Sequence, residues 1–165
     1  MNVILRSLRY FFLLVLTLSN SYALEIGQVA PNCVLTALHD NTPFTLTQPG
    51  KVIYIDFWAS WCAPCAQSMP FINELYTQYH HKGFEVIGVN LDDNPNDAYK
   101  FLEKIQVTFP IVQNSDHQCP DVYGVQAMPS SYLVDRAGKV RFIHFGFYNN
   151  QKEDIRQRIE KLIAE

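Results

Sequence analysis

The feature that most constrains the fold is a nearly continuous apolar run over residues 51–58. Two cysteines come shortly after this run, and a helical pattern follows them. An apolar run without alternation is typical of a central strand that is covered on both faces. The next segment reads Trp61-Cys62-Ala63-Pro64-Cys65, and apolar side chains then recur at helical spacing through residue 79. This order places Cys62 at a helix start, where unpaired backbone N–H groups and the helix dipole stabilise a thiolate. The pattern therefore indicates dithiol chemistry.

Short apolar runs alternate with helical patterns along the rest of the chain, and no repeat, low-complexity tract or linker interrupts them. This alternation is typical of the α/β class. Strands are expected at 34–38, 44–47, 84–91, 109–113, 130–134 and 139–145. Helices are expected from the CxxC to a stop at Gly83, from Pro95 to about residue 105, at 120–123, and from Asn150, where Glu153 is placed to complete a capping box.

Residues 1–23 have the composition of an export signal. Two arginines give a positive start, residues 10–18 form an apolar core, and Ser21-Tyr22-Ala23 places small residues at the positions that a signal peptidase reads. This core is shorter than the roughly 20 residues needed to span a bilayer. We therefore expect cleavage after residue 23, one domain over residues 24–165, and a periplasmic or otherwise exported location, with an uncleaved membrane anchor as the alternative.

The charge of the expected mature domain bears on the partners that it can bind. Without the two arginines of the signal it carries 11 basic and 16 acidic side chains, a net charge near −5. This balance gives no sign of nucleic-acid or anionic-membrane binding. We expect no nucleic-acid partner.

All four cysteines, at positions 33, 62, 65 and 119, lie in the expected mature domain. An exported chain meets an oxidising compartment in which disulfides persist, and four cysteines allow three pairings. The CxxC favours Cys62 with Cys65, which leaves Cys33 with Cys119 as a structural staple. The alternative for this second pair is two separate buried thiols that act as small apolar residues.

The stretch from Asp56 to Cys65, which reads DFWASWCAPC, resembles the active-site stretch of thioredoxins, and the rest of the chain resembles the exported TlpA/ResA branch of that superfamily. The segments at 30–32, 125–131 and 133–140 fall where that family places similar ones. The resemblance implies a thioredoxin-like α/β fold: a central mixed sheet with helices on both faces, an N-terminal β-hairpin, and an inserted strand and helix at 109–123.

The resemblance assigns roles to three residues. Cys62 is the expected nucleophile, Cys65 the resolving thiol, and Asp56 lies where thioredoxin has a buried aspartate. A carboxyl group in an apolar strand has a raised pKa, which suits it to exchange a proton with Cys65. The alternative is an aspartate that is bonded structurally to nearby backbone or water. The family also carries a glutamate three residues after the second cysteine, and this chain has Ser68 there.

Four residues are expected to form a docking surface beside the nucleophile. Trp61, Pro64 and Met128 would supply a flat apolar face, although a partly exposed structural tryptophan would look the same in sequence. Pro129 matches the cis-proline loop that faces the dithiol in the family. Here the resemblance alone predicts the cis bond, because most X–Pro bonds are trans.

These features predict a protein-disulfide oxidoreductase that needs no cofactor besides its Cys62–Cys65 disulfide and no metal. We expect a monomer that reduces disulfides of exported proteins, apocytochrome c among the candidates, with electrons from a membrane donor of the DsbD/CcdA kind. A second class is a copper-binding delivery protein that uses Cys62 and Cys65 as ligands. A third is a redox-inert protein that retains the fold, and the intact CxPC argues against it.

His80 and His81 lie at a helix end, where interaction with the helix dipole is commoner than metal binding.

Overall fold

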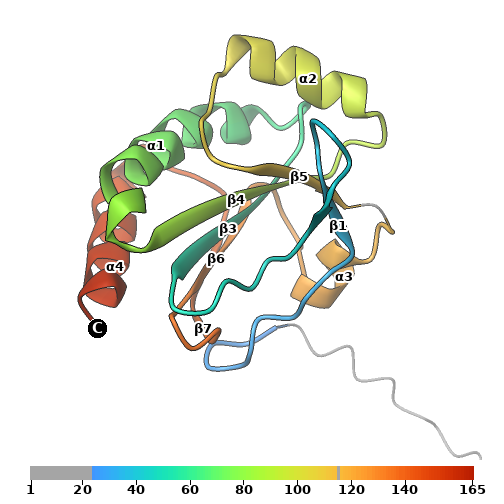
Figure 1. The fold of residues 1–165 in the computed structure, drawn as a ribbon. Coiled ribbons are helices and arrows are strands. Elements are labelled where there is room, and N and C mark those ends of the chain that lie inside the picture. Colours follow the sequence, from blue (N-terminus) through green and yellow to red (C-terminus); the bar gives the residue numbers. More distant parts are fainter. Residues whose placement is uncertain (1–23, 115) are drawn as a thin grey trace, which may run out of the picture.

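The computed structural model describes residues 24–114 and 116–165, so the predicted export signal at 1–23 lies outside the described residues. The described chain forms one mixed sheet of seven strands in the order β2-β1-β5-β4-β3-β6-β7 (Figure 1). The strands are β1 Leu35–Ala37, β2 Pro43–Phe44, β3 Val52–Trp58, β4 Phe84–Asn90, β5 Ile111–Asn114, β6 Ser130–Val134 and β7 Val140–Phe145. The helices are α1 Ala63–Tyr79, α2 Pro95–Lys104, α3 Cys119–Tyr123 and α4 Lys152–Ala164.

Strand β3 lies between a parallel and an antiparallel neighbour. It pairs parallel to β4, to which α1 connects it, and antiparallel to β6. Strand β5 continues the parallel part beside β4, whereas β1 and β7 are antiparallel to their neighbours. The mixed sheet of the predicted α/β class is confirmed, and the parallel crossover from β3 to β4 places the start of α1 above the carboxyl end of β3.

Both faces of the sheet are covered, as the unbroken apolar run of β3 predicted. All seven of its residues are buried. Tyr54 and Trp58 point into the core that α1 and α4 cover. Ile55 and Phe57 point into a second core that contains residues of α3 and of the stretch 24–34, here called the N-terminal segment. Burial on both faces fixes the position of the strand that precedes the CxxC.

Two predicted boundaries differ from the structure. The second strand of the N-terminal hairpin is only two residues long. The predicted capping box of Asn150 and Glu153 is wrong, because residues 149–151 form a 3₁₀ turn and α4 begins at Lys152. The backbone N–H of Tyr148 donates instead to Oε1 of Gln151 at 3.1 Å. The capping contact therefore forms two residues earlier than the sequence indicated.

No helix within residues 24–114 and 116–165 is long and apolar enough to cross a membrane.

Candidate active site

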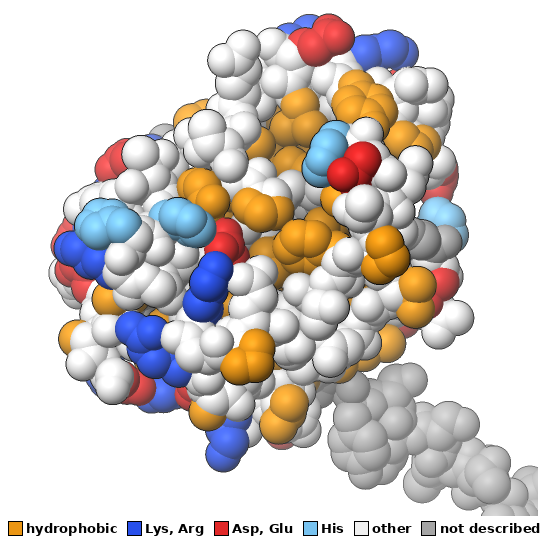
Figure 2. Space-filling model, in the orientation of Figure 1, with side chains coloured by type: hydrophobic (Ala, Val, Ile, Leu, Met, Phe, Trp, Pro, Cys, Tyr) orange, Lys and Arg blue, Asp and Glu red, His pale blue; other side chains and the backbone are white. Residues whose placement is uncertain are grey.

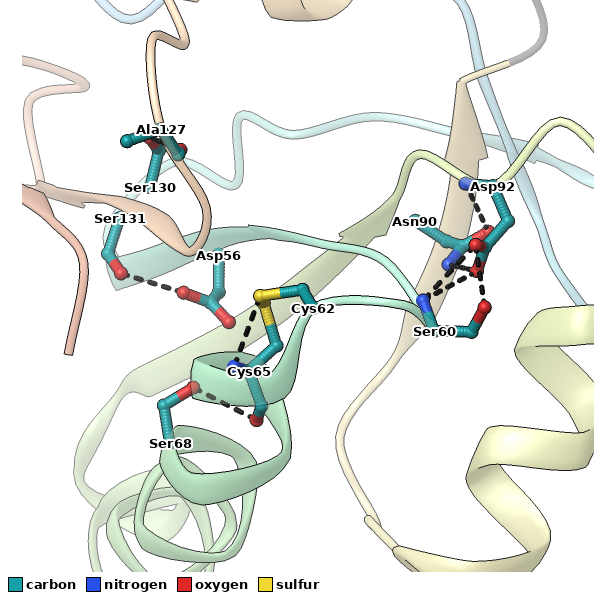
Figure 3. The surroundings of a disulfide bond; sticks show 10 residues. All are labelled: Asp56, Ser60, Cys62, Cys65, Ser68, Asn90, Asp92, Ala127, Ser130 and Ser131. Carbon is teal, nitrogen blue, oxygen red and sulfur yellow. Dashed lines mark hydrogen bonds between the residues drawn. A yellow bond between two sulfur atoms is a disulfide. The ribbon is translucent and has the colours of Figure 1, made fainter.

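The two cysteines of the CxxC form a disulfide at the N-terminus of α1, with 2.08 Å between the sulfurs (Figure 3). Cys62 is the N-cap of α1, and its Sγ accepts a hydrogen bond from the backbone N–H of Cys65 at 3.2 Å. Pro64 lies in the first turn, where a missing N–H costs no intrahelical bond. Cys62 is 4% exposed and Cys65 is 0% exposed. Cys62 is therefore the sulfur that an approaching group meets first.

Asp56 lies in β3, fully buried, and Figure 3 shows its carboxyl group between Ser131 and the disulfide. The Ser131 hydroxyl donates to Oδ1 of Asp56 at 2.7 Å, whereas Oδ2 has no hydrogen-bond partner among the described residues. Burial raises the pKa of Asp56 to about 7, and the Ser131 hydrogen bond offsets part of this rise. Asp56 can therefore release or accept a proton near neutral pH.

The position of the family glutamate is occupied by a serine that faces the helix backbone. Ser68 is buried, and its hydroxyl donates to the carbonyl oxygen of Cys65 at 3.2 Å. This contact satisfies the hydroxyl locally and brings no charge to the dithiol. Tyr54, the other buried acid near Asp56, has a pKa raised by burial and by the Asp56 charge, so it stays protonated. Of these three buried side chains, Asp56 is the one whose pKa lies near neutral pH.

A carboxylate from the loop that follows β4, that of Asp92, holds the loop before the nucleophile, and the sequence analysis missed it. The backbone N–H of Ser60 donates to Oδ2 of Asp92 at 2.9 Å, and the Ser60 hydroxyl donates to Oδ1 at 2.8 Å. Asn90 donates its side-chain N–H to the same carboxylate at 2.8 Å (Figure 3). A usable signal was present, because Asp92 lies two residues after the end of β4, which is parallel to β3, and the carboxyl ends of parallel strands share one edge.

A groove of about 650 Å³ opens beside Cys62. It is mainly apolar and is lined by Trp61, Cys62, Ala63, Pro64, Leu91, Pro120, Val125, Gln126, Ala127 and Met128. Trp61 is 71% exposed, an unusual degree for a tryptophan and one that leaves its ring free to contact another molecule. Three of the four predicted docking residues thus meet at the groove, together with Leu91 and Pro120, which the sequence analysis did not single out.

The fourth predicted docking residue lies behind the groove. Pro129 is buried, is not part of the lining, and accepts a hydrogen bond from the backbone N–H of Gly146 at 2.7 Å. The peptide bond between Met128 and Pro129 is cis. Pro129 therefore lies next to the surface that Met128 exposes, and does not itself form part of it.

The remaining two cysteines are also bonded. Cys33 and Cys119 form a disulfide whose sulfurs are 2.03 Å apart and whose residues are 86 positions apart in the sequence. This bond joins the N-terminal segment to the first residue of α3.

A different apolar hollow is visible in Figure 2 below α2, where α1, α2 and the β1 hairpin meet. It measures about 510 Å³, and no cysteine lines it.

His80, one of the two histidines at the end of the first helix, lies 3.6 Å from the carboxylate of Glu85. The described residues contain no group of three or more His, Cys, Asp or Glu side chains able to hold a metal ion.

A disulfide that caps a helix after the central strand of such a sheet, with a buried carboxyl group behind it, defines a class. This class is the thioredoxin-like thiol-disulfide oxidoreductases, and the chain is one of them.

Comparison with known proteins agrees. The Redoxin family model matches residues 25–159, and the chain belongs to this family. The thiol-disulfide oxidoreductase ResA of Geobacillus thermodenitrificans is 37% identical over 140 residues, which cover 85% of this chain and 79% of that protein.

Solved structures resemble the fold closely. A Chlorobium tepidum protein described as a thiol:disulfide interchange protein DsbE superposes with a TM-score of 0.81 at 41% identity, over 86% of this chain and 99% of that one. The thioredoxin domain of a thiol-disulfide oxidoreductase from Bacteroides vulgatus gives a TM-score of 0.76 over 86% of this chain and 99% of that one. Its identity of 24% shows the fold alone.

Proposed function

We propose that this protein is an exported reductase of protein disulfides, which passes two electrons from the Cys62/Cys65 dithiol to a substrate disulfide. The observation that carries the proposal is the division of the dithiol. Cys62 borders an apolar groove, whereas Cys65 and Asp56 are fully buried behind it. A substrate in the groove meets one sulfur, and the other is reserved for the second step.

The reaction proceeds through a mixed disulfide. The Cys62 thiolate attacks one substrate sulfur, the substrate S–S bond breaks, and the other substrate sulfur leaves as a thiolate that takes up a proton. Cys65 then gives its proton to Asp56 and attacks Sγ of Cys62. The mixed disulfide breaks, the second substrate sulfur leaves as a thiolate that takes up the proton from Asp56, and the protein is left with the Cys62–Cys65 disulfide of the present structure.

The compartment, the electron donor and the substrates form the finer part of the proposal. The composition of residues 1–23 supports export. An exported reductase has no direct access to cytosolic NADPH, so we propose a membrane donor of the DsbD/CcdA kind. The resemblance to the TlpA/ResA branch supports exported proteins as substrates, including the haem-site cysteines of apocytochrome c. The reactive disulfide is the only redox group that the proposal needs.

Turnover and metal content together test the proposal. We expect the protein to reduce hydroxyethyl disulfide and insulin, and the Cys62→Ser variant to lose both activities. Stoichiometric copper in the purified protein without turnover would instead support copper delivery. For direction, we expect a midpoint potential near that of thioredoxin, about −270 mV, whereas a value near about −120 mV, as in DsbA, would make the protein an oxidant.

A further inference from the structure

One wall of the groove beside Cys62 belongs neither to the sheet nor to α1. Its lining residues are Pro120 and residues 125–128, which lie in the segment 119–128, here called the groove wall. The five-residue helix α3 forms the first half of this segment, and the second half is irregular up to the start of β6 at Ser130. The position of the groove wall therefore depends on the contacts of α3 together with two links to β6, in which the Ser130 hydroxyl donates to the carbonyl oxygen of Ala127 at 2.5 Å and the Tyr132 hydroxyl donates to that of Tyr123 at 2.8 Å.

The N-terminal segment holds α3 at both ends. Cys119, the first residue of α3, is bonded to Cys33, and the hydroxyl of Tyr123, the last residue, donates to the carbonyl oxygen of Pro31 at 2.8 Å. Cys119 and Tyr123 are both buried, with 0% and 1% exposure. The two contacts fix the rotation of α3 as well as its position, because they lie at opposite ends of one short helix.

The N-terminal segment is itself attached to the sheet. The backbone N–H of Ala30 donates to the carbonyl oxygen of Gly138 at 2.9 Å, and the pairing of β1 with β5 begins at Leu35, two residues after Cys33. The disulfide thus connects the groove wall to a part of the chain that the sheet holds in place. Pro120, which lines the groove, is bonded directly to Cys119.

We propose that the Cys33–Cys119 disulfide positions the groove wall and thereby sets how well the enzyme accepts protein disulfides relative to small ones. The inference rests on the proposed function, in which the groove receives the polypeptide that carries the substrate disulfide. A small disulfide needs to reach only Cys62. A polypeptide also contacts the groove wall, and binding to a mobile wall includes the cost of ordering it.

The test compares two substrates in one pair of proteins. In the Cys33→Ala/Cys119→Ala variant we expect the KM for insulin to rise about tenfold, which corresponds to about 1.4 kcal/mol of binding, with kcat within about twofold. We expect kcat/KM for hydroxyethyl disulfide to stay within about twofold of wild type. Alkylation and mass spectrometry of the wild type must show that Cys33 and Cys119 remain bonded during the assay.

A second variant keeps the test decisive if the double variant does not fold. Tyr123→Phe removes the hydroxyl that donates to Pro31 and leaves both the disulfide and the ring contacts with Phe57 and Tyr132 in place. We expect its KM for insulin to rise about threefold. This rise corresponds to about half of the 1.4 kcal/mol expected for the double variant, a size typical of the net contribution of one hydrogen bond. Tyr79→Phe is the matched control, because Tyr79 is an equally buried tyrosine whose hydroxyl bonds to Glu160 on α4, and we expect no change in KM.

The outcomes separate the inference from the function on which it rests. An unchanged KM for insulin in Tyr123→Phe and in the folded double variant overturns the inference. An equal loss of kcat/KM for both substrates also overturns it, since the disulfide would then support the reactive centre as a whole. Activity that persists in Cys62→Ser overturns the proposed function itself, whatever the results for Cys33→Ala/Cys119→Ala and Tyr123→Phe.

Discussion

Replacing Asp56 by asparagine is expected to stabilise the oxidised protein above neutral pH and to leave it nearly unchanged in acid. Asparagine has almost the same shape as the protonated aspartic acid, and its side-chain oxygen can still accept the hydrogen bond from Ser131. The variant therefore removes the charge that Asp56 acquires at high pH and little else.

The size of the effect follows from the pKa of Asp56. Burial raises it to about 7 in the folded protein, from 3.8 for an unperturbed aspartate. Between these two values the folded protein holds a proton that the unfolded chain has released, so stability is full below the lower pKa and declines as pH rises through the upper one. At 1.36 kcal/mol for each pKa unit, the total loss in the wild type is about 4 kcal/mol.

Urea unfolding of both oxidised proteins at pH 4.0 and pH 8.5 measures this loss. We expect Asp56→Asn to gain about 4 kcal/mol of unfolding free energy relative to wild type between the two pH values. A relative change below about 1 kcal/mol would refute the reasoning, because Asp56 would then ionise in the folded protein at its ordinary pKa. In the reduced protein the same variant is expected to slow resolution of the mixed disulfide by about 10²-fold at pH 7, since Cys65 loses its proton acceptor.

Three further substitutions probe the groove, the loop before Cys62 and the packing of the sheet. Trp61→Ala removes a ring that is 71% exposed, so we expect the unfolding free energy to change by less than about 0.5 kcal/mol while the KM for insulin rises; an unchanged KM would show that the ring takes no part in docking. Asp92→Ala leaves the donors of Ser60 without their acceptor, so we expect the unfolding free energy in urea to fall by about 1–3 kcal/mol and insulin reduction to slow. Unaltered kinetics would mean that the loop holds its position without Asp92. Gly88→Ala places a Cβ 2.7 Å from Cδ1 of Ile111, so we expect the unfolding free energy in urea to fall by about 1–3 kcal/mol. A variant as stable as wild type would contradict this.

The parts of the molecule that local sequence determines were predictable. The apolar run predicted the central strand, and the cysteines that follow it predicted the start of α1. The strand and the helix start could both be predicted because each depends on residues within one strand or one helical turn. Asp56, six positions before Cys62, was assigned its place beside the dithiol by the resemblance to thioredoxins.

The contacts that complete the site depend on strand register, which a single sequence does not specify. Ser131 reaches Asp56 because β6 pairs with β3 in the register that sets these two residues opposite each other, although they are 75 positions apart. Asp92 reaches Ser60 through the parallel pairing of β3 and β4. Pro120 joins the groove by way of α3, whose position depends on the N-terminal segment. Each of these contacts needed the assembled sheet to be recognised.

The central claim is that Cys62 attacks the substrate and Cys65 resolves the mixed disulfide. The most direct test is to mix reduced Cys65→Ser protein with insulin, digest the product without reducing agent, and locate the adduct by mass spectrometry. The account predicts a stable disulfide between insulin and Cys62, which is absent when wild-type protein is used. An adduct on Cys33 or Cys119, or no adduct at all, would contradict it.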